Sequence, residues 1–271
     1  MHIAAIQMVS GARLDDNLRA AAALLAQAAQ QGAELALLPE YFCCLGRRDT
    51  DKLAIQEDFG AGPIQEFLAT QARTLGIWIV GGTLPLTSPQ PQKVYNSSLV
   101  FDPQGQCVAR YDKIHLFRFD NGREAYDESR VLLPGTQPAL FEMLARDGHR
   151  WRVGLSVCYD LRFAELYRAH AAQGADLLLV PSAFTYTTGQ AHWELLLRAR
   201  AVENLCCVAA AAQGGVHDNG RHTWGHSMVI DAWGTVLARQ AQEPGVVLAD
   251  LDAGALAALR AQLPALQHRV L

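Results

Sequence analysis

The sequence lacks the features that mark export, membrane insertion or nucleic-acid binding. Its N-terminus has no basic start followed by an apolar stretch, as a secretory signal would. The longest apolar-looking run, residues 20–29, is interrupted by Gln27 and is too short to span a bilayer. Charged residues make up only 18% of the chain, the net charge is −4, and the basic residues are scattered. These absences predict a cytoplasmic protein that binds neither nucleic acid nor a membrane.

The motifs of metal and nucleotide sites are also missing. Six cysteines include no C-x-x-C spacing, and four of them form the adjacent pairs 43–44 and 206–207. Nine histidines include no H-E-x-x-H motif, and Gly81-Gly82 and Gly214-Gly215 lack the further glycines and the lysine of a phosphate loop. We therefore expect mostly reduced cysteines that fill space, no metal and no cofactor.

What the sequence does contain is an alternation of strand-like and helical segments, with half of its 271 residues hydrophobic. No low-complexity linker divides it, so we expect one domain over residues 1–271, built from layers of strands and helices. The expected strands are 3–9, 34–38, 77–80, 95–101, 106–112, 151–157, 176–180, 205–211, 227–230, 235–238 and 246–250. The expected helices are 15–31, capped by Asp15 or Asp16, and 63–75, 163–173, 190–204 and 253–262, while residues 118–138 should be loop-like.

Two segments of the chain are alike. Residues 32–39 (GAELALLP) resemble residues 174–181 (GADLLLVP), and each follows a helix rich in alanine and glutamine. One interpretation is a common helix-to-strand join. The other is a fold built from two related halves.

Cys158 is the strongest candidate for chemistry. It ends the apolar run RVGLSVC, and a helix is expected shortly after it. A cysteine at a strand–turn–helix junction would be partly exposed near the positive end of a helix, which favours a thiolate. The backbone N–H groups after the turn could hold an oxyanion. Most cysteines at strand ends only fill space, so the interpretation depends on companion residues.

Three such companions are present. Glu40 ends the strand-like run LALLPE, where partial desolvation suits a general base. Lys113 lies among apolar residues in YDKIHLF and could stabilise an oxyanion, or pair with Asp112 or with a glutamate elsewhere. Glu128, in the loop-like stretch, could orient Lys113 or a substrate amide. A thiol, a carboxylate and an ammonium are the groups needed to cleave a carbon–nitrogen bond covalently.

Other arrangements stay open at this stage. His192, His222 and His226 could support a cysteine–histidine pair. A redox-sensing thiol would need a resolving cysteine near Cys158, which the neighbouring sequence does not supply. A binding protein without activity is the alternative from another class, although an intact set of three reactive groups argues against it.

Substrate-binding candidates follow the cysteine. Arg162 lies four residues after Cys158, so its guanidinium could bind a substrate carboxylate, or it could pair with Glu165. Tyr186 and Thr188 could contribute hydroxyl groups. Arg200 and Glu203, three residues apart on one helix, are expected to form a structural ion pair.

Taken together, LLPEYF, YDKIHLF and GLSVCYDLRFAELYR resemble the nitrilase superfamily of carbon–nitrogen hydrolases. The resemblance extends over nearly the whole chain, through DESRVLLPG and the segment 181–204 to WGHSMVIDAWGTVLA. It implies a four-layer α-β-β-α sandwich with two mixed sheets between helical layers. It also implies a Glu40–Lys113–Cys158 triad, a thioester intermediate, no metal or cofactor, and a homodimer.

Within the superfamily, the chain looks most like the branch of omega-amidases and deaminated glutathione amidases. The segment with Gln213, His217 and the His226-Ser227-Met228 run, and PSAF with Ser182, resemble the second group more closely. The resemblance implies an amide substrate bearing a carboxylate, either deaminated glutathione or a ketoacid amide such as 2-oxoglutaramate. The residues expected to bind it are Tyr159, Arg162, Ser182, Phe184 and Thr188. The C-terminal residues 267–271 depart from the usual acidic-aromatic tail.

Overall fold

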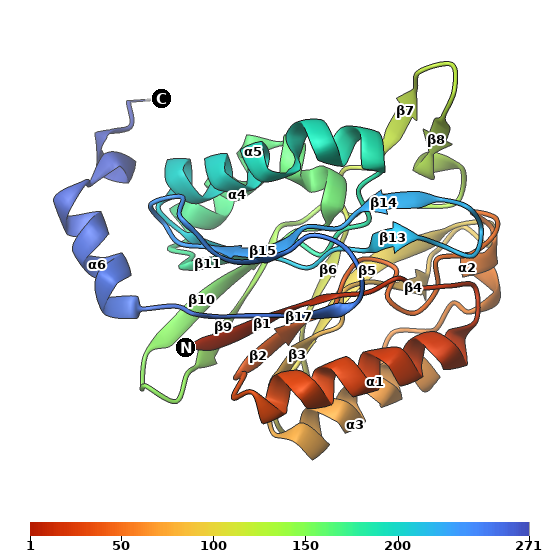
Figure 1. Ribbon diagram of the computed structural model, residues 1–271, viewed down its shortest axis with the longest axis horizontal. Coiled ribbons are helices and arrows are strands. Elements are labelled where there is room, and N and C mark those ends of the chain that lie inside the picture. Colours follow the sequence, from red (N-terminus) through yellow and green to blue (C-terminus); the bar gives the residue numbers. More distant parts are fainter. Residues whose placement is uncertain (271) are drawn as a thin grey trace.

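The computed structural model describes residues 1–270 and contains two large sheets (Figure 1). The first sheet has the strand order β17 (Gly245–Asp250), β1 (His2–Gln7), β2 (Leu35–Leu37), β3 (Trp78–Val80), β5 (Val94–Phe101) and β4 (Leu84–Thr87), with β6 (Cys107–Asp112) also paired to β5. The second has the order β16 (Val236–Gln240), β15 (Ser227–Ile230), β12 (Cys207–Ala210), β11 (Leu177–Leu179), β10 (Arg150–Leu155) and β9 (Ala139–Leu144). Both sheets mix parallel and antiparallel pairs.

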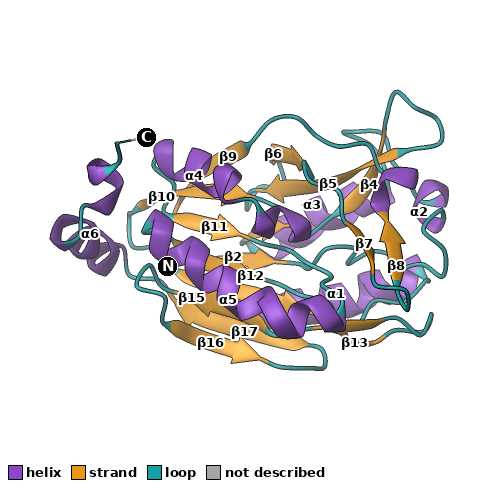
Figure 2. Cartoon of the chain, turned by 90° about the horizontal axis from the view of Figure 1, so that it is seen from above, coloured by secondary structure: helices purple, strands orange, loops and turns teal. Residues whose placement is uncertain are grey.

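Helices cover the outer faces of both sheets. The helices are α1 (Leu14–Gln30), α2 (Asp51–Ala54), α3 (Pro63–Leu75), α4 (Ala164–Ala172), α5 (Tyr186–Asn204) and α6 (Ala253–Gln262). Figures 1 and 2 show α1 and α3 beside the first sheet and α4 and α5 beside the second, while α6 projects at one end. The expected α-β-β-α sandwich is thereby confirmed.

The alternation of side chains along β1 explains the layering. Ile3 and Ala5 belong to the core that includes residues of both sheets, whereas Ala4 and Ile6 belong to a second core with α1 and α3. Successive residues of a strand point to opposite faces, so a strand covered on both sides reads as a continuous apolar run. This is why residues 3–6 of β1 and residues 35–37 of β2 are all apolar.

The two similar segments occupy equivalent places. β2 lies between two parallel neighbours, β1 and β3, and β11 lies between the parallel neighbours β10 and β12. Each is three residues long, follows a helix, and is followed by a proline, Pro39 or Pro181. The topology favours the interpretation of two related halves, which we call the β2 half and the β11 half.

Most predicted elements are present within a few residues, and α3 and α6 have the predicted bounds. The hairpin of β5 and β6 is also confirmed. The sequence interpretation missed six strands: β7 (Arg118–Asp120) and β8 (Ala125–Asp127), which are described below, and β4, β9, β13 (Gly214–Val216) and β14 (His222–Trp224). The last two pair with each other in a separate two-stranded sheet.

Three local predictions were wrong. Residues 118–138 are not simply a loop, because they contain the hairpin of β7 (Arg118–Asp120) and β8 (Ala125–Asp127) and a 3₁₀ turn, Glu128–Arg130. The N-cap of α1 is Arg13, with no side-chain cap, and the predicted caps Asp15 and Asp16 lie inside the first turn. Helix α5 begins at Tyr186, four residues before the predicted start at 190.

The cause of the early start of α5 is a cap that the sequence interpretation overlooked. The hydroxyl oxygen of Thr185 accepts a hydrogen bond from the backbone N–H of Thr188, which satisfies one of the free donors of the first turn. The cap adds one turn to the helix, and that turn places Thr188 near Cys158.

Three further findings concern the chain as a whole. All six cysteines are free, and five are buried. Within residues 1–270, no helix has both the length and the apolar character needed to cross a membrane. Leu271, the last residue of the unusual C-terminal segment, lies outside the described residues, and the single domain over 1–271 stays a prediction.

Candidate active site

Three segments that are distant in sequence converge where their strands end. Glu40 follows β2, Lys113 follows β6 directly, and Cys158 follows β10. The Glu40 and Lys113 side chains are almost completely buried, and Lys113 Nζ lies 2.9 Å from Glu40 Oε1. The structure therefore brings the predicted base and the predicted oxyanion donor into direct contact.

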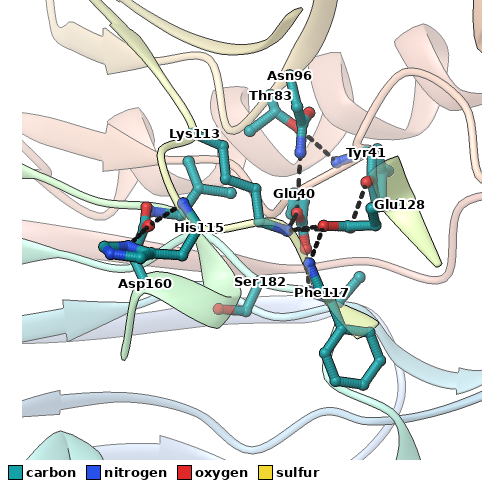
Figure 3. A network of polar contacts seen from close by, with 12 residues as sticks. Glu40, Tyr41, Thr83, Asn96, Lys113, His115, Phe117, Glu128, Asp160 and Ser182 are labelled. Carbon is teal, nitrogen blue, oxygen red and sulfur yellow. Dashed lines mark hydrogen bonds and ion pairs between the residues drawn. The ribbon is translucent and has the colours of Figure 1, made fainter. Parts of the chain in front are cut away.

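Glu40 is held by donors from both halves. Its Oε1 accepts hydrogen bonds from Lys113 Nζ and from the side-chain amide of Asn96, each at 2.9 Å (Figure 3). Its Oε2 accepts from the backbone N–H of Ala183 at 2.9 Å. The Gln213 amide donates to the Glu40 carbonyl at 3.1 Å. A buried carboxylate with three charged or polar donors is held in one orientation.

Lys113 forms a second ion pair with Glu128, at 2.8 Å to Oε2 and 3.0 Å to Oε1. The Glu128 carboxylate also accepts from the Tyr41 hydroxyl at 2.8 Å and from the Phe117 N–H at 2.7 Å (Figure 3). The alternative partner of Lys113, Asp112, instead binds Arg110. Glu128 is therefore part of the buried network, as predicted.

The charges in this network stabilise one another. Burial opposes the positive charge of Lys113, but Glu128 and Glu40 outweigh it and hold the pKa of Lys113 well above its ordinary value. Burial likewise opposes the charge of Glu128, yet Lys113 and the hydrogen bonds lower the pKa of Glu128. Lys113 therefore remains an ammonium and Glu128 a carboxylate at neutral pH.

Cys158 occupies a strained turn. It begins the 3₁₀ turn Cys158–Arg162, and its φ of 51° lies in the left-handed region that residues other than glycine rarely adopt. Its backbone N–H donates to the carbonyl of Pro181 at 3.0 Å, which ties the turn to the end of β11. This N–H is therefore already occupied in the folded protein.

The expectation of an exposed, thiolate-favouring cysteine was wrong. Cys158 is only 7% exposed, and burial raises the pKa of its thiol well above the ordinary value. The negative charge of Glu40 raises this pKa further, Lys113 opposes it, and a hydrogen bond to Glu40 adds to the increase. The thiol is thus protonated at rest and within electrostatic reach of both partners. The 3₁₀ turn carries less dipole than the expected α-helical start, which removes one source of thiolate stabilisation.

Asp160 connects the cysteine turn to the lysine segment. Its Oδ2 accepts hydrogen bonds from the Tyr111 hydroxyl at 2.6 Å and the Val157 N–H at 2.8 Å. Its Oδ1 contacts the backbone N–H and the ring Nδ1 of His115 at 3.0 and 2.7 Å (Figure 3). Because Tyr111 and His115 flank Lys113 in sequence, this buried carboxylate fixes Cys158 relative to Lys113.

A small cavity of about 10 Å³ opens at Cys158. Four of the five predicted substrate-binding residues line it, namely Tyr159, Arg162, Phe184 and Thr188. Ser182 is not among its lining residues, and the Ser182 hydroxyl is buried and donates to the Val180 carbonyl at 3.4 Å. We therefore correct the expectation for Ser182, since the residue contacts the strand end and not the cavity.

Arg162 faces the cavity without an acidic partner among residues 1–270. Its Nη2 lies 3.0 Å from the His192 ring, and its guanidinium lies 5.8 Å from the centre of the Tyr159 ring. No ion pair with Glu165 is formed within the described chain, in contrast to the structural alternative. Arg200 and Glu203 do form the expected pair, at 2.7 Å.

No histidine among the described residues lines the cavity at Cys158, so the cysteine–histidine alternative has no structural support. His217 is buried and bound to the Ser10 carbonyl and the Thr223 hydroxyl. His226 stacks on Trp224, and the ring of His222 stacks on that of Tyr186, which does not line the cavity.

Several residues of the network were not predicted. Asn96 and Asp160 carry buried polar groups inside apolar runs, and Tyr41 follows Glu40 directly. The available signal was the polar residue itself, because a strand buried on both faces has little reason to contain an asparagine. Groups of three or more possible metal ligands are absent from the part of the chain that the structure describes.

Comparison with known proteins gives a consistent result. The family model "Carbon-nitrogen hydrolase" matches residues 2–261. A deaminated glutathione amidase of Synechocystis sp. is 42% identical over 98% of this chain and 97% of its own length, and an omega-amidase of Mus musculus is 38% identical over 98% and 94%. The C. elegans NitFhit crystal structure is 37% identical and has a TM-score of 0.89 over 99% of this chain. The chain spans only 65% of that protein.

Proposed function

The chain belongs to the carbon–nitrogen hydrolase family, and from this premise we propose that it is a cysteine-dependent amidase acting on deaminated glutathione. The observation that carries the proposal is the cavity at Cys158, where an arginine without an acidic partner among the described residues lies beside the thiol. Arg162 is partly buried, and a guanidinium in a cavity favours a carboxylate, so the substrate is an amide that carries one.

The first step is proton transfer from Cys158 to Glu40. The raised pKa of the Cys158 thiol means that the nucleophile must be activated as it attacks. Glu40 supplies the base, because it faces the thiol and is fixed by Asn96 and Ala183. Sulfur then forms a bond to the amide carbon, and the carbonyl π electrons move to oxygen.

The developing oxyanion is stabilised by Lys113 Nζ and the Tyr159 N–H. Lys113 enters the reaction already charged, and Glu128 fixes its position through two contacts. A preorganised donor of this kind typically contributes about 3–4 kcal/mol to lowering the barrier. Glu128 is a positioning residue in this scheme.

The remaining steps complete the balance of atoms. Protonated Glu40 returns the proton to the leaving nitrogen as the carbon–nitrogen bond breaks, which leaves a thioester on Cys158 and a free amine. Glu40 then accepts a proton from water, and the hydroxide adds to the thioester carbon. Loss of the thiolate and its reprotonation release a carboxylic acid and restore the enzyme.

The substrate's ketoacid part is placed in the cavity. Its carboxylate binds Arg162, with hydrogen bonds available from the Thr188 hydroxyl, while Phe184 and Tyr159 provide the apolar walls. Cleavage of deaminated glutathione then gives a ketoacid and a dipeptide. The 38% identity to an omega-amidase supports a second candidate, the hydrolysis of a ketoacid amide such as 2-oxoglutaramate, which releases ammonia.

A product assay separates these candidates. Purified protein is incubated with each compound, and the dipeptide, the ketoacid and ammonia are quantified. We expect a higher kcat/KM for deaminated glutathione, no turnover by Cys158→Ala, and an acyl adduct on Cys158 in the intact mass of protein quenched during turnover. Amine release by Cys158→Ala at the wild-type rate would disprove the mechanism. A higher kcat/KM for 2-oxoglutaramate would favour the omega-amidase.

We also propose a cytoplasmic homodimer. The outer face of α5 carries the exposed apolar side chains Leu195 and Val202 beside a broad hollow that contains none of the catalytic candidates. Burial of this face between two copies would remove the apolar surface from water. Light scattering should give twice the chain mass of 29.5 kDa, and Leu195→Glu should shift the protein toward monomer.

A further inference from the structure

A second small cavity adjoins the one at Cys158. Phe117 lines both cavities, and the second has a volume of about 20 Å³. Glu128, the partner of Lys113, also lines it. The second cavity therefore meets the buried network at Glu128.

Arg221 lies in this second cavity with its charge unpaired. It forms no ion pair with any carboxylate within residues 1–270, and its Nε is buried without a hydrogen-bond acceptor. Its closest contacts are a long hydrogen bond to the Ala183 carbonyl, 3.4 Å, and the Tyr126 ring, whose centre is 5.0 Å from the guanidinium carbon. A buried guanidinium N–H without an acceptor is costly unless a ligand supplies one.

Lys52 adds a second positive charge to the same cavity. Its side chain is only 14% exposed, its Nζ lies 4.6 Å from the centre of the Tyr41 ring, and it forms a long ion pair with Asp49, at 3.9 Å. Burial lowers the pKa of Lys52, and the nearby Arg221 charge lowers it as well. An anion between the two side chains would relieve both effects.

Asp49 forms a long ion pair with Lys52, and the other two acidic residues of the cavity, Glu128 and Asp127, are occupied elsewhere. Glu128 binds Lys113, and Asp127 accepts hydrogen bonds from Ser129 and lies near Arg130. These two carboxylates therefore do not neutralise Arg221 or Lys52 directly.

We propose that Arg221 and Lys52 form a subsite for a carboxylate on the leaving amine of the substrate. This inference rests on the proposed function, since it assumes that the ketoacid part occupies the cavity at Cys158. The scissile amide then lies beside Phe117 and Glu128, and the leaving amine extends into the second cavity. The two cavities together bind substrates that have a carboxylate on each side of the amide. The subsite at Arg221 and Lys52 favours such substrates over amides that release only ammonia.

The test compares substrates that differ only in this second carboxylate. They are deaminated glutathione, its C-terminal glycinamide analogue, in which the carboxylate is neutral, and 2-oxoglutaramate. The proteins are wild type, Arg221→Gln, Lys52→Gln and the control Arg19→Gln, which removes an arginine from the exposed face of α1. Melting temperatures are measured for each variant.

We expect the wild type to prefer the acid over the glycinamide. Arg221→Gln should reduce this preference in kcat/KM by about 10- to 100-fold, the usual range for a lost hydrogen bond to a charged group. Lys52→Gln should reduce it by a smaller factor, mainly through KM, and Arg19→Gln should leave it unchanged. Arg221→Lys, which keeps the charge without the fork, should recover part of the preference.

Two outcomes would overturn the inference. In the first, the wild type cleaves the acid and the glycinamide equally well. In the second, Arg221→Gln lowers kcat/KM for all three substrates by the same factor, which is the result expected of a structural arginine stacked on Tyr126. Failure of the proposed function is distinguishable, because the wild type would then cleave none of the three compounds.

Discussion

The β2 half and the β11 half share one similar segment, residues 32–39 and 174–181, but bring different groups to the site. After β2 the chain continues with Pro39 and Glu40, and after β11 it continues with Pro181 and Ser182. Glu40 extends a carboxylate into the buried network, whereas the Ser182 hydroxyl bonds back to its own strand end. The halves meet where the Ala183 N–H donates to Glu40.

This difference shows that the fold places the two strand ends equivalently, whereas the side chain at each end decides which chemical group reaches the site. Both strand ends are buried at equivalent places, yet only one carries a charge, and the other supplies a neutral donor that fixes it. The comparison can be tested from the largest expected effect to the smallest.

The largest effect is expected from separate substitutions of the two residues that follow the prolines, Glu40 and Ser182. Glu40→Gln removes the base and should lower kcat by about 10⁴-fold, as for members of other catalytic triads. Ser182→Ala removes one weak hydrogen bond and should change kcat by less than about threefold. Steady-state kinetics on deaminated glutathione measure both. If Ser182→Ala lowered kcat nearly as much as Glu40→Gln does, both halves would contribute equally to the chemistry.

A smaller effect is expected at Lys113, which joins the carboxylates. Lys113→Met should lower kcat by about 10²- to 10³-fold through loss of an oxyanion donor. It should also lower the free energy of unfolding by about 3–5 kcal/mol, because Glu40 and Glu128 remain buried without their cation. Urea titration gives the second quantity.

The double variant Lys113→Met/Glu128→Gln separates the two roles of the lysine. Because Glu128→Gln removes one of the two carboxylates left without a cation, it should restore part of the free energy of unfolding and none of kcat. Equal recovery of both would contradict the assignment of Lys113 to oxyanion stabilisation.

Asp160 belongs to the β11 half and sets the position of the thiol relative to Lys113. Asp160→Asn places an amide N–H₂ group against hydrogen-bond donors, the Tyr111 hydroxyl or the His115 N–H. It should lower the free energy of unfolding by about 1–3 kcal/mol and kcat by about tenfold. KM should change little, since Asp160 does not line the cavity. Asp112→Asn is the matched control beside Lys113, and it should leave kcat within about threefold of wild type. A normal kcat in Asp160→Asn would exclude the positioning role.

The smallest expected effect is on the pH dependence of the free energy of unfolding, and it arises from a further difference between the halves. The carbonyls of Ala28 and His170 accept equivalent hydrogen bonds, from Ala33 and Ala175, but only His170 titrates. Burial lowers the pKa of His170, so the unfolded chain binds its proton at a higher pH than the folded protein does. The free energy of unfolding should therefore fall as the pH drops below about 6.5.

His170→Gln should reduce this slope by up to about 1.4 kcal/mol per pH unit. Urea titrations between pH 5 and 8, in about half-unit steps around the histidine range, measure it. An unchanged slope in the variant would mean that His170 is protonated in the folded protein.

The sequence was sufficient where local rules decide the structure. Helix α3 has the predicted bounds because Pro63 starts it and Gly76, with a φ of 64°, ends it. The convergence of Glu40, Lys113 and Cys158 was predicted from the resemblance and from strand-like runs that end near these residues, and the structure brings Glu40 and Lys113 into contact. Their catalytic roles stay a prediction.

The burial of individual side chains and their contacts with residues far away in the sequence could not be predicted from the sequence. The burial of Cys158 depends on segments far away in the chain, and so does its raised pKa. The hairpin of β7 and β8 escaped notice because its residues are largely exposed and lack an apolar alternation. Arg221 and Lys52 are about 170 residues apart, and only the folded chain places them in one cavity.

The left-handed backbone at position 158 has a consequence for how this protein can change over time. Glycine accepts such a conformation at no steric cost, so replacing the cysteine by glycine would relax the turn while abolishing turnover. Selection for catalysis thus acts against a thermodynamic preference at a single codon.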